Sequence, residues 1–184
     1  KKYFDFFDQN ILKIKKDIFW GIDQIEIFID RHKNDKLLNF DKNNETLFSM
    51  LKHKNIYDLL NKSLRNKKIF KKFFINDENF YKKIMNKNRY DLIINFDPTN
   101  KISKKYFNKK IIKDYNSSAY TTVLKHESLR NKKAIQIFTK YGPIAFLPIS
   151  KTETSVVFSI VNQKKKLSES KVFNLIKTFN LNYK

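Results

Sequence analysis

The stretch from Ala134 to Ile160 constrains the fold of this 184-residue chain more than any other part of it. It contains three apolar runs rich in Ile, Val, Phe and Thr, at Ala134–Thr139, Ile144–Ile149 and Ser155–Ile160. Short polar loops separate the runs. Apolar runs of this length, broken by short loops, are typical of consecutive antiparallel strands. The stretch therefore predicts a meander of three strands in one sheet.

Glycine and proline punctuate this stretch, although both are rare in the chain. Gly142 is one of two glycines, and Pro143 and Pro148 are two of three prolines. Glycine permits backbone angles that other residues avoid, and proline removes a hydrogen-bond donor from the strand ladder. Because Pro148 lies inside an apolar run, it favours an edge strand or a bulge, where the backbone faces a ligand instead of another strand.

Hydrophobic periodicity predicts the remaining elements. Helices are expected at Tyr3–Ile18, which Trp20-Gly21 would end, at Asn55–Leu64, and at Leu167–Leu181 with Ser168 as its cap. Strands are expected at Ile22–Ile29, Leu37–Phe40, Ile69–Ile75, Phe80–Met85, Asp91–Phe96 and Ser117–Lys125. The fold class that follows is α+β, an antiparallel or mixed sheet with flanking helices.

Three segments divide the chain in this interpretation. Residues 1–90 form a helix-rich segment with a hairpin and a linking helix, residues 91–116 form a connecting segment, and residues 117–184 form the sheet and its closing helix. The continuously apolar Asp91–Phe96 is typical of a strand buried in a parallel sheet. It ends at Asp97-Pro98-Thr99-Asn100, a turn by composition.

Composition excludes several classes of function. The chain has no cysteine, which removes disulfides, thiolate metal sites and cysteine nucleophiles. No apolar run reaches the roughly 20 residues of a membrane-spanning helix, and no signal peptide is visible. No His cluster has the spacing of a metal site, and no Ser/His/Asp arrangement or paired carboxylates are visible. His126 and Glu127 are adjacent, so on a strand they would point to opposite faces.

A formal net charge of +21 raises the possibility of a lysine-rich nucleic-acid-binding module. The excess is nearly all lysine, whereas arginine, the better fork for bases and phosphates, is rare. Abundant Asn, Ile and Phe beside the lysines match the product of an AT-rich genome. We therefore interpret the charge as compositional drift on a solvated surface, with no specific nucleic-acid partner.

Several short motifs with matching spacing carry a family resemblance. A-x-Q-x-F begins at Ala134, G-P-I-A-F-L-P-I begins at Gly142, and T-S-V-V-F-S begins at Thr154. Upstream stand Tyr120-Thr121-Thr122 and Lys125-His126-Glu127. Together these motifs resemble the middle of the FAD-dependent aromatic hydroxylases of ubiquinone biosynthesis.

The resemblance implies a monooxygenase that uses FAD, NAD(P)H and oxygen to hydroxylate a polyprenylated phenol. In that family a substrate domain with a large mixed sheet interrupts a dinucleotide-binding domain and packs over the flavin. Residues 91–116 resemble its second FAD motif, with Asp97 as the cofactor-binding residue but Pro98 in place of glycine. No G-x-G-x-x-G occurs in the sequence, so the chain resembles an excised or truncated hydroxylase.

The flavin hydroperoxide delivers the oxygen in such enzymes, so the protein needs only to exclude water and orient the ring. No catalytic residue is assigned. The expected substrate-binding residues are Tyr120, Phe138, Gly142, Pro143, Ala145, Leu147, Pro148 and Phe158. Tyr120 is the candidate partner for the ring hydroxyl of the substrate. An equally ordinary interpretation is that Tyr120 is buried and its hydroxyl binds a backbone group.

Two further interpretations stay open at this point. The chain could be a catalytically lapsed paralogue that serves as a subunit of the same pathway, or the basic module described above. Under the resemblance, the expected location is the cytoplasm or the periphery of the inner membrane. Under the same resemblance, the chain is expected to associate with the membrane surface or with a complex of ubiquinone biosynthesis.

Overall fold

The computed structural model describes residues 5–6, 8–9, 13–14, 16–30, 36–41, 45–65, 67–73, 78–86, 90–107, 111–161, 167–180 and 182–184. The chain forms two compact units. One, which we call the sheet unit, comprises residues 1–63 and 115–184. The other, the inserted unit, comprises residues 64–114. These boundaries differ from those expected at residues 90 and 116.

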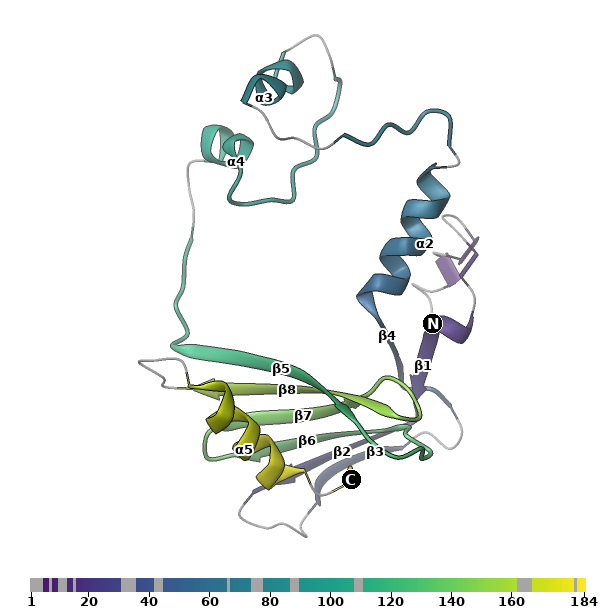
Figure 1. Cartoon of the computed structure of the whole chain (residues 1–184), viewed down its shortest axis with the longest axis vertical. Coiled ribbons are helices and arrows are strands. Elements are labelled where there is room, and N and C mark those ends of the chain that lie inside the picture. Colours follow the sequence, from purple (N-terminus) through teal and green to yellow (C-terminus); the bar gives the residue numbers. More distant parts are fainter. Residues whose placement is uncertain are drawn as a thin grey trace. The chain divides into compact units, whose positions relative to one another are not determined.

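A six-stranded mixed sheet forms the centre of the sheet unit (Figure 1). Its strands, in spatial order, are β3 (Lys36–Asp41), β2 (Gln24–Ile29), β6 (Lys133–Thr139), β7 (Gly142–Pro148), β8 (Glu153–Val161) and β5 (Ser117–Lys125). Strands β2 and β6 are parallel, and every other neighbouring pair is antiparallel. The predicted α+β class, with a mixed sheet and helices, is therefore confirmed.

The predicted meander is confirmed as β6, β7 and β8. Gly142 opens β7 with a positive φ of 131°. A Cβ atom at this position would lie 2.1 Å from the Ser159 carbonyl oxygen on β8. Any side chain would therefore collide with the neighbouring backbone, and the left-handed φ would strain it further. Glycine is required here for the close approach of two strands.

Pro148 corrects one expectation. It closes β7, which is an inner strand between β6 and β8, and its register with Thr154 shows no bulge. The prediction of an edge strand or a bulge was wrong. The pairing of β7 with β6 already stops at Phe146, so at Pro148 the strand has one partner only. A residue without an N–H group is tolerated at such a strand end.

Helix α5 (Glu169–Phe179) covers one face of the sheet and confirms the predicted closing helix. Ser168 occupies the N-cap position without a side-chain capping bond. The rings of Phe158 and Phe179 meet edge to face at 6.2 Å. The buried core between sheet and helix consists of Ile135, Ile137, Ile144, Phe146, Val156, Phe158, Ile160, Val172, Ile176 and Phe179.

A two-stranded sheet and a helix complete the described part of the N-terminal region. Strands β1 (Phe19–Ile22) and β4 (Phe48–Leu51) pair antiparallel, and helix α2 (His53–Arg65) confirms the predicted helix after them. The single strand predicted at Ile22–Ile29 is instead divided at Asp23, because β1 and β2 join different sheets.

The predicted N-terminal helix Tyr3–Ile18 lies partly outside the described residues. Asp5, Phe6, Asp8 and Gln9 are helical, and Lys16–Ile18 forms the 3-10 turn η1. Trp20 and Gly21, expected to end the helix, lie within β1.

The inserted unit contains the short helices α3 (Glu78–Ile84) and α4 (Lys101–Tyr106). The strand predicted at Phe80–Met85 was wrong, since most of it is α3. Its apolar residues at three- and four-residue spacing also fit a helix. Residues 69–73 have no regular structure, and the end of the strand predicted at Ile69–Ile75 lies outside the described residues.

Asp91–Phe96 is also not a strand. Among the described residues, neither this segment nor the rest of the inserted unit pairs with a strand. Its apolar side chains are solvent-exposed, with Leu92 at 75%, Ile94 at 68% and Phe96 at 92%. A strand needs a neighbouring strand edge to satisfy its backbone hydrogen bonds. Because Asp91–Phe96 has no such edge among the described residues, its apolar pattern gave a wrong strand prediction.

Candidate functional site

The six-stranded sheet has two chemically different faces. Successive strand residues point to opposite faces, and residues paired across strands share a face. Ile137, Ile144 and Phe158 are paired across β6, β7 and β8 and lie under α5, on what we call the covered face. Their neighbours in sequence belong to the opposite, open face.

The open face is lined by small and apolar side chains. Its members on β2, β6, β7, β8 and β5 include Ile25, Ile27, Gln136, Phe138, Pro143, Ala145, Leu147, Ser155, Val157, Ser159, Ala119, Thr121 and Val123, with the charged pair Lys125 and Glu153 at one end. Phe138 and Val123 are 43% and 49% exposed, in contrast to the fully buried Phe158 of the covered face. A partly exposed, apolar sheet face without charged side chains at its centre is suited to contact a flat apolar ligand.

Four of the expected substrate-binding residues lie on this open face. Phe138 and Pro143 are directly paired across β6 and β7, and Ala145 and Leu147 follow along β7. Gly142, at the start of β7, is packed against the Ser159 carbonyl of β8. The structure therefore brings Phe138, Pro143, Ala145 and Leu147 together on one surface.

The other three expected residues lie on the covered face. Phe158 is fully buried in the core, and Pro148 is among the fully buried side chains. The hydroxyl oxygen of Tyr120 accepts a hydrogen bond of 2.8 Å from the Leu167 backbone N–H. The hydroxyl of Tyr120 thus binds backbone beside the start of α5. These three residues do not share a wall with Ala145.

Asp97, the expected cofactor-binding residue, lies in the inserted unit and is held by its own turn. Its Oδ1 atom accepts hydrogen bonds from Thr99 Oγ1 at 2.6 Å and from the Thr99 backbone N–H at 2.8 Å. These bonds, the side-chain bond first, lower the pKa of the Asp97 carboxyl. Asn100 then caps α4 by accepting from the Ser103 N–H at 2.9 Å. The carboxylate is exposed and ionised, and its nearest donors belong to the turn.

The residues present do not form a cradle for the pyrophosphate of FAD. Such a cradle needs backbone N–H groups at a Gly-rich turn before a helix. Pro98 follows Asp97 and has no N–H to donate. Neither of the two glycines of the chain stands near this turn, since they are Gly21 and Gly142.

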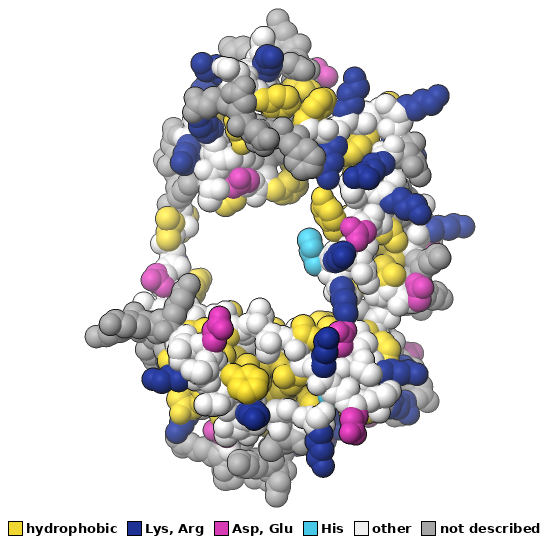
Figure 2. All heavy atoms as spheres, in the orientation of Figure 1, with side chains coloured by type: hydrophobic (Ala, Val, Ile, Leu, Met, Phe, Trp, Pro, Cys, Tyr) yellow, Lys and Arg dark blue, Asp and Glu magenta, His cyan; other side chains and the backbone are white. Residues whose placement is uncertain are grey.

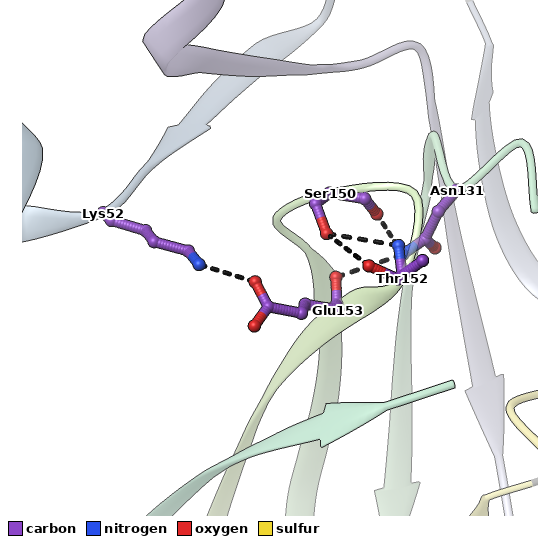
Figure 3. A network of polar contacts seen from close by, with 5 residues as sticks. All are labelled: Lys52, Asn131, Ser150, Thr152 and Glu153. Atoms are coloured by element: carbon purple, nitrogen blue, oxygen red, sulfur yellow. Dashed lines mark hydrogen bonds and ion pairs between the residues drawn. The ribbon is translucent and has the colours of Figure 1, made fainter. Parts of the chain in front are cut away.

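A buried polar cluster around Asn131 ties together the loops at one end of the sheet (Figure 3). Asn131 is 2% exposed, and its Nδ2 atom donates to the Ser150 carbonyl and to Thr154 Oγ1, both at 2.9 Å. The backbone carbonyl oxygen of Asn131 accepts a hydrogen bond from Trp20 Nε1 at 2.5 Å. Beside it, Lys52 and Glu153 form an ion pair of 2.5 Å. These bonds join the two-stranded sheet to the six-stranded one.

Two aromatic side chains complete this cluster. The Tyr183 hydroxyl donates to Asn131 Oδ1 at 3.2 Å, and burial raises the pKa of that hydroxyl. The His126 ring lies 4.7 Å from the Tyr183 ring and contacts Thr154 Oγ1 at 3.0 Å. Asn131 carried no recognisable sequence signal, because a lone asparagine in a polar loop belongs to no pattern. The hydrogen bonds of Asn131 hold neighbouring loops together and serve a structural role.

Lysine and arginine side chains are spread over the visible face of both units (Figure 2). The excess charge is unevenly distributed along the sequence. Residues 64–114 hold 15 of the 39 Lys and Arg but 5 of the 18 Asp and Glu, a net charge of +10. The inserted unit therefore combines the densest positive charge with exposed apolar side chains.

Within the described ranges, no group of three or more His, Asp or Glu side chains could hold a metal ion. No helix in this part of the chain is long and apolar enough to cross a bilayer. Comparison with models of known protein families and with curated proteins finds no match for the sequence.

Proposed function

We propose that this chain supplies the substrate-binding sheet of an FAD-dependent monooxygenase that hydroxylates a polyprenylated phenol in ubiquinone biosynthesis. The open face is the proposed contact surface for the phenol. Phe138, Ala145 and Leu147 are the residues proposed to contact the ring. The expected residues of the covered face serve the core instead.

The open face is the observation that carries this proposal. The motifs that resemble the hydroxylase family fall on β5, β6, β7 and β8, which are adjacent in one mixed sheet. On the central strand, Ala145 stands between Pro143 and Leu147 on this face. A small residue flanked by apolar ones gives room for a flat ring and offers it no competing charge.

The order of the units along the chain gives independent support. Strands β2 and β3 precede the inserted unit, and β5 to β8 follow it, yet all six belong to one sheet. The hydroxylase family combines a substrate sheet with a dinucleotide-binding domain in an interleaved order.

The chemistry asked of these residues is limited. When bound, FAD would supply the oxygen-activating redox chemistry, with NAD(P)H as reductant. The open face would hold the ring, keep water from it and fix its orientation. Since the pyrophosphate cradle is missing from these residues, we expect the 184-residue chain to retain no FAD through gel filtration. A stoichiometric yellow protein would contradict that expectation.

The direct test measures binding of a short-chain prenylated phenol to the chain by calorimetry. Replacing Ala145 by Trp should fill the face and weaken binding at least tenfold. The matched control is Ala119→Trp, on the same face but on edge strand β5, which should leave binding within a factor of two. Equal affinities for the two variants and the parent chain would refute the open face as the phenol site.

A binding module for nucleic acid is the second candidate, and the charge of the inserted unit is the observation that favours it. A net charge of +10 within residues 64–114 would attract a polyanion through counterion release. The scarcity of arginine argues for contact without sequence selectivity. In a salt-titrated assay with duplex DNA, we expect weak binding that disappears near physiological salt. Tight, sequence-selective binding there would favour this second function over the monooxygenase.

A further inference from the structure

A recess of about 190 Å³ opens on the covered face, where α5 ends. Strands β2, β6 and β7 form its floor, and the chain that follows α5 forms its wall. The lining is apolar at Phe28, Ile29, Ile135, Ile137, Phe146 and Phe179, and it includes the ring of Tyr183. An engineered apolar cavity of about 150 Å³ accommodates benzene, so a volume of this size admits a single aromatic ring.

Glu26 gives this apolar recess a polar anchor. It lies on β2 and pairs with the core residue Ile135 of β6 on the covered face, it lines the recess, and it is only 6% exposed. Its Oε1 atom accepts from Lys36 Nζ at 2.5 Å and from Gln24 Nε2 at 3.3 Å. Its Oε2 atom lies 3.2 Å from Lys133 Nζ. A buried carboxylate on a strand is costly unless it is paired, and these two lysines pair it.

The protonation state of Glu26 makes it a hydrogen-bond acceptor at neutral pH. Burial raises the pKa of its carboxyl, but the hydrogen bonds and charges of Lys36 and Lys133 outweigh burial and lower the pKa overall. An ionised carboxylate has about four acceptor positions. Three donors are present in the part of the chain that the structure describes. One acceptor position therefore remains for a ligand that donates a hydrogen bond.

The charges at the recess select against charged ligands. Asp30 and Glu26 both line it, so a ligand carboxylate would face two carboxylates. A ligand cation would compete with Lys36 and Lys133, which already neutralise Glu26. The side-chain amides of Asn180 and Asn182 complete the polar part of the lining. An uncharged ligand avoids both conflicts.

We propose that this recess binds a single uncharged aromatic ring that carries an O–H or N–H donor. The ring lies against the Phe and Ile side chains of the floor, and its donor binds the Glu26 carboxylate. The site is separate from the proposed phenol surface, because the recess is on the covered face and Ala145 is on the open face. The inference does not depend on the proposed function.

The experiment titrates the Ala145→Trp chain, in which the proposed phenol surface of the open face is filled, with phenol, toluene and benzoate by ligand-observed NMR. This chain is the parent of the variants below, so open-face binding does not contribute to the signal. Phenol and toluene have similar rings, but only phenol donates a hydrogen bond, and benzoate carries a negative charge. We expect saturable binding of phenol, binding of toluene about tenfold weaker, and no binding of benzoate in the same concentration range. Tenfold corresponds to about 1.4 kcal/mol, close to the lower end of the range for a hydrogen bond to a charged group.

Two variants assign the binding to the recess. Thr178→Trp places a large ring at the rim from an exposed position on α5 and should abolish binding of both phenol and toluene. Its matched control is Asn174→Trp, one turn earlier on the same helix and outside the lining, which should change nothing. Glu26→Gln should weaken phenol about tenfold and leave toluene unchanged.

Thermal melts of each variant establish that the sheet unit is folded before binding is compared. No saturable binding of phenol by the parent chain would overturn the proposal. Phenol binding that survives Thr178→Trp in a folded variant would overturn it as well, since the ligand would then bind elsewhere. Equal affinity of phenol and toluene would remove Glu26 from the site and refute the proposed ligand class.

Discussion

Two largely apolar segments of six residues have different structures in this molecule. Ile144–Ile149 forms most of β7, an inner strand with partners on both sides. Asp91–Phe96 has four apolar residues and is followed by the turn at Asp97-Pro98, yet it forms no strand. Ile144 is fully buried, whereas Leu92 is 75% exposed. The strand β7 has neighbouring strands to pair with, whereas Asp91–Phe96 has none among the described residues.

An apolar run becomes a strand only where a neighbouring strand edge supplies hydrogen bonds for its backbone N–H and C=O groups. Ile144 pairs with Ile137 on one side and with Phe158 on the other. Those pairings provide main-chain hydrogen bonds and cross-strand side-chain contacts at once. Asp91–Phe96 has the residues of a buried strand but no such edge within the described residues.

Hydrogen exchange should show the largest contrast between the two segments. The amides of Ile144 and Phe146 are expected to exchange only through global unfolding, whereas those of Leu92 and Ile94 should exchange at nearly unprotected rates. For a domain stable by about 5 kcal/mol, the protection factors should differ by roughly three to four orders of magnitude. Amide exchange followed by mass spectrometry measures this directly. Comparable protection would mean that Asp91–Phe96 pairs with another strand in solution.

Truncating one phenylalanine in each region should give the next largest difference. Phe158 is fully buried in the core, so Phe158→Ala should cost about 3–5 kcal/mol of unfolding free energy. Phe96 is 92% exposed, so Phe96→Ala should change it by no more than about 0.5 kcal/mol. Urea denaturation of both variants provides the measurement. A large loss for Phe96→Ala would show that its ring is buried in solution.

The two glycines offer a sharper comparison within the sheet unit. Gly142→Ala would place a methyl group 2.1 Å from the Ser159 carbonyl oxygen at a positive φ, and should cost about 2–3 kcal/mol. Gly21→Ala would meet only the Thr46 side chain, at 3.1 Å, and should cost less than about 1 kcal/mol. The unfolding free energies of the two variants test this ranking. A smaller loss for Gly142→Ala than for Gly21→Ala would contradict the close approach of β7 and β8.

The smallest expected effect concerns two carboxylates, one in each unit. The pKa of Glu26 is lowered by Lys36 and Lys133 in spite of burial, so its ionised form favours the folded state. Its contribution is present above the ordinary value of 4.5 and is lost as the pH falls through the lower folded value. Stability of the sheet unit should therefore decline below pH 4.5, and Glu26→Gln should flatten that decline.

Asp97 provides the matched control for this pH dependence. Its pKa is lowered by Thr99 within a local turn of the inserted unit, so Asp97→Asn should leave the acid transition of the sheet unit unchanged. Thermal melts from neutral to acidic pH compare the two variants. An acid transition identical in Glu26→Gln and the parent chain would assign it to other carboxyl groups.

The elements that local pattern determines were predicted well. Short loops between apolar runs led to the β6–β7–β8 meander, and Ser117–Lys125 matches β5. The periodicity of α2 and α5 was also sufficient. These elements pair with neighbours in sequence or bury one regular row of apolar side chains. A short stretch of sequence is therefore enough to predict them.

Long-range pairing was beyond the same reasoning. Nothing in Ile22–Ile29 indicates that β1 pairs with β4 while β2 joins β6. Strand predictions in the inserted unit failed for the same reason, because apolar residues alone do not identify a partner edge.

The candidate site was predicted only in part. Pattern located the strand that carries Ala145 and Leu147, but it did not separate the two faces of the sheet. Phe138 and Phe158 were expected on one wall, whereas the register places them on opposite faces. Tertiary pairing also created the Glu26 recess, which sequence did not indicate, since Lys36 and Lys133 come from strands on either side of β2.

The parallel pairing of β2 with β6 has a consequence for the synthesis of this protein on the ribosome. Gln24 pairs with Lys133, so β2 and β3 are synthesised long before the strand that anchors them in the sheet. At translation rates of about 5–20 residues per second, the wait amounts to roughly 5–20 s. Until then the edge of β2 that pairs with β6 is open, and an unpaired strand edge is the kind of surface on which cellular chaperones act.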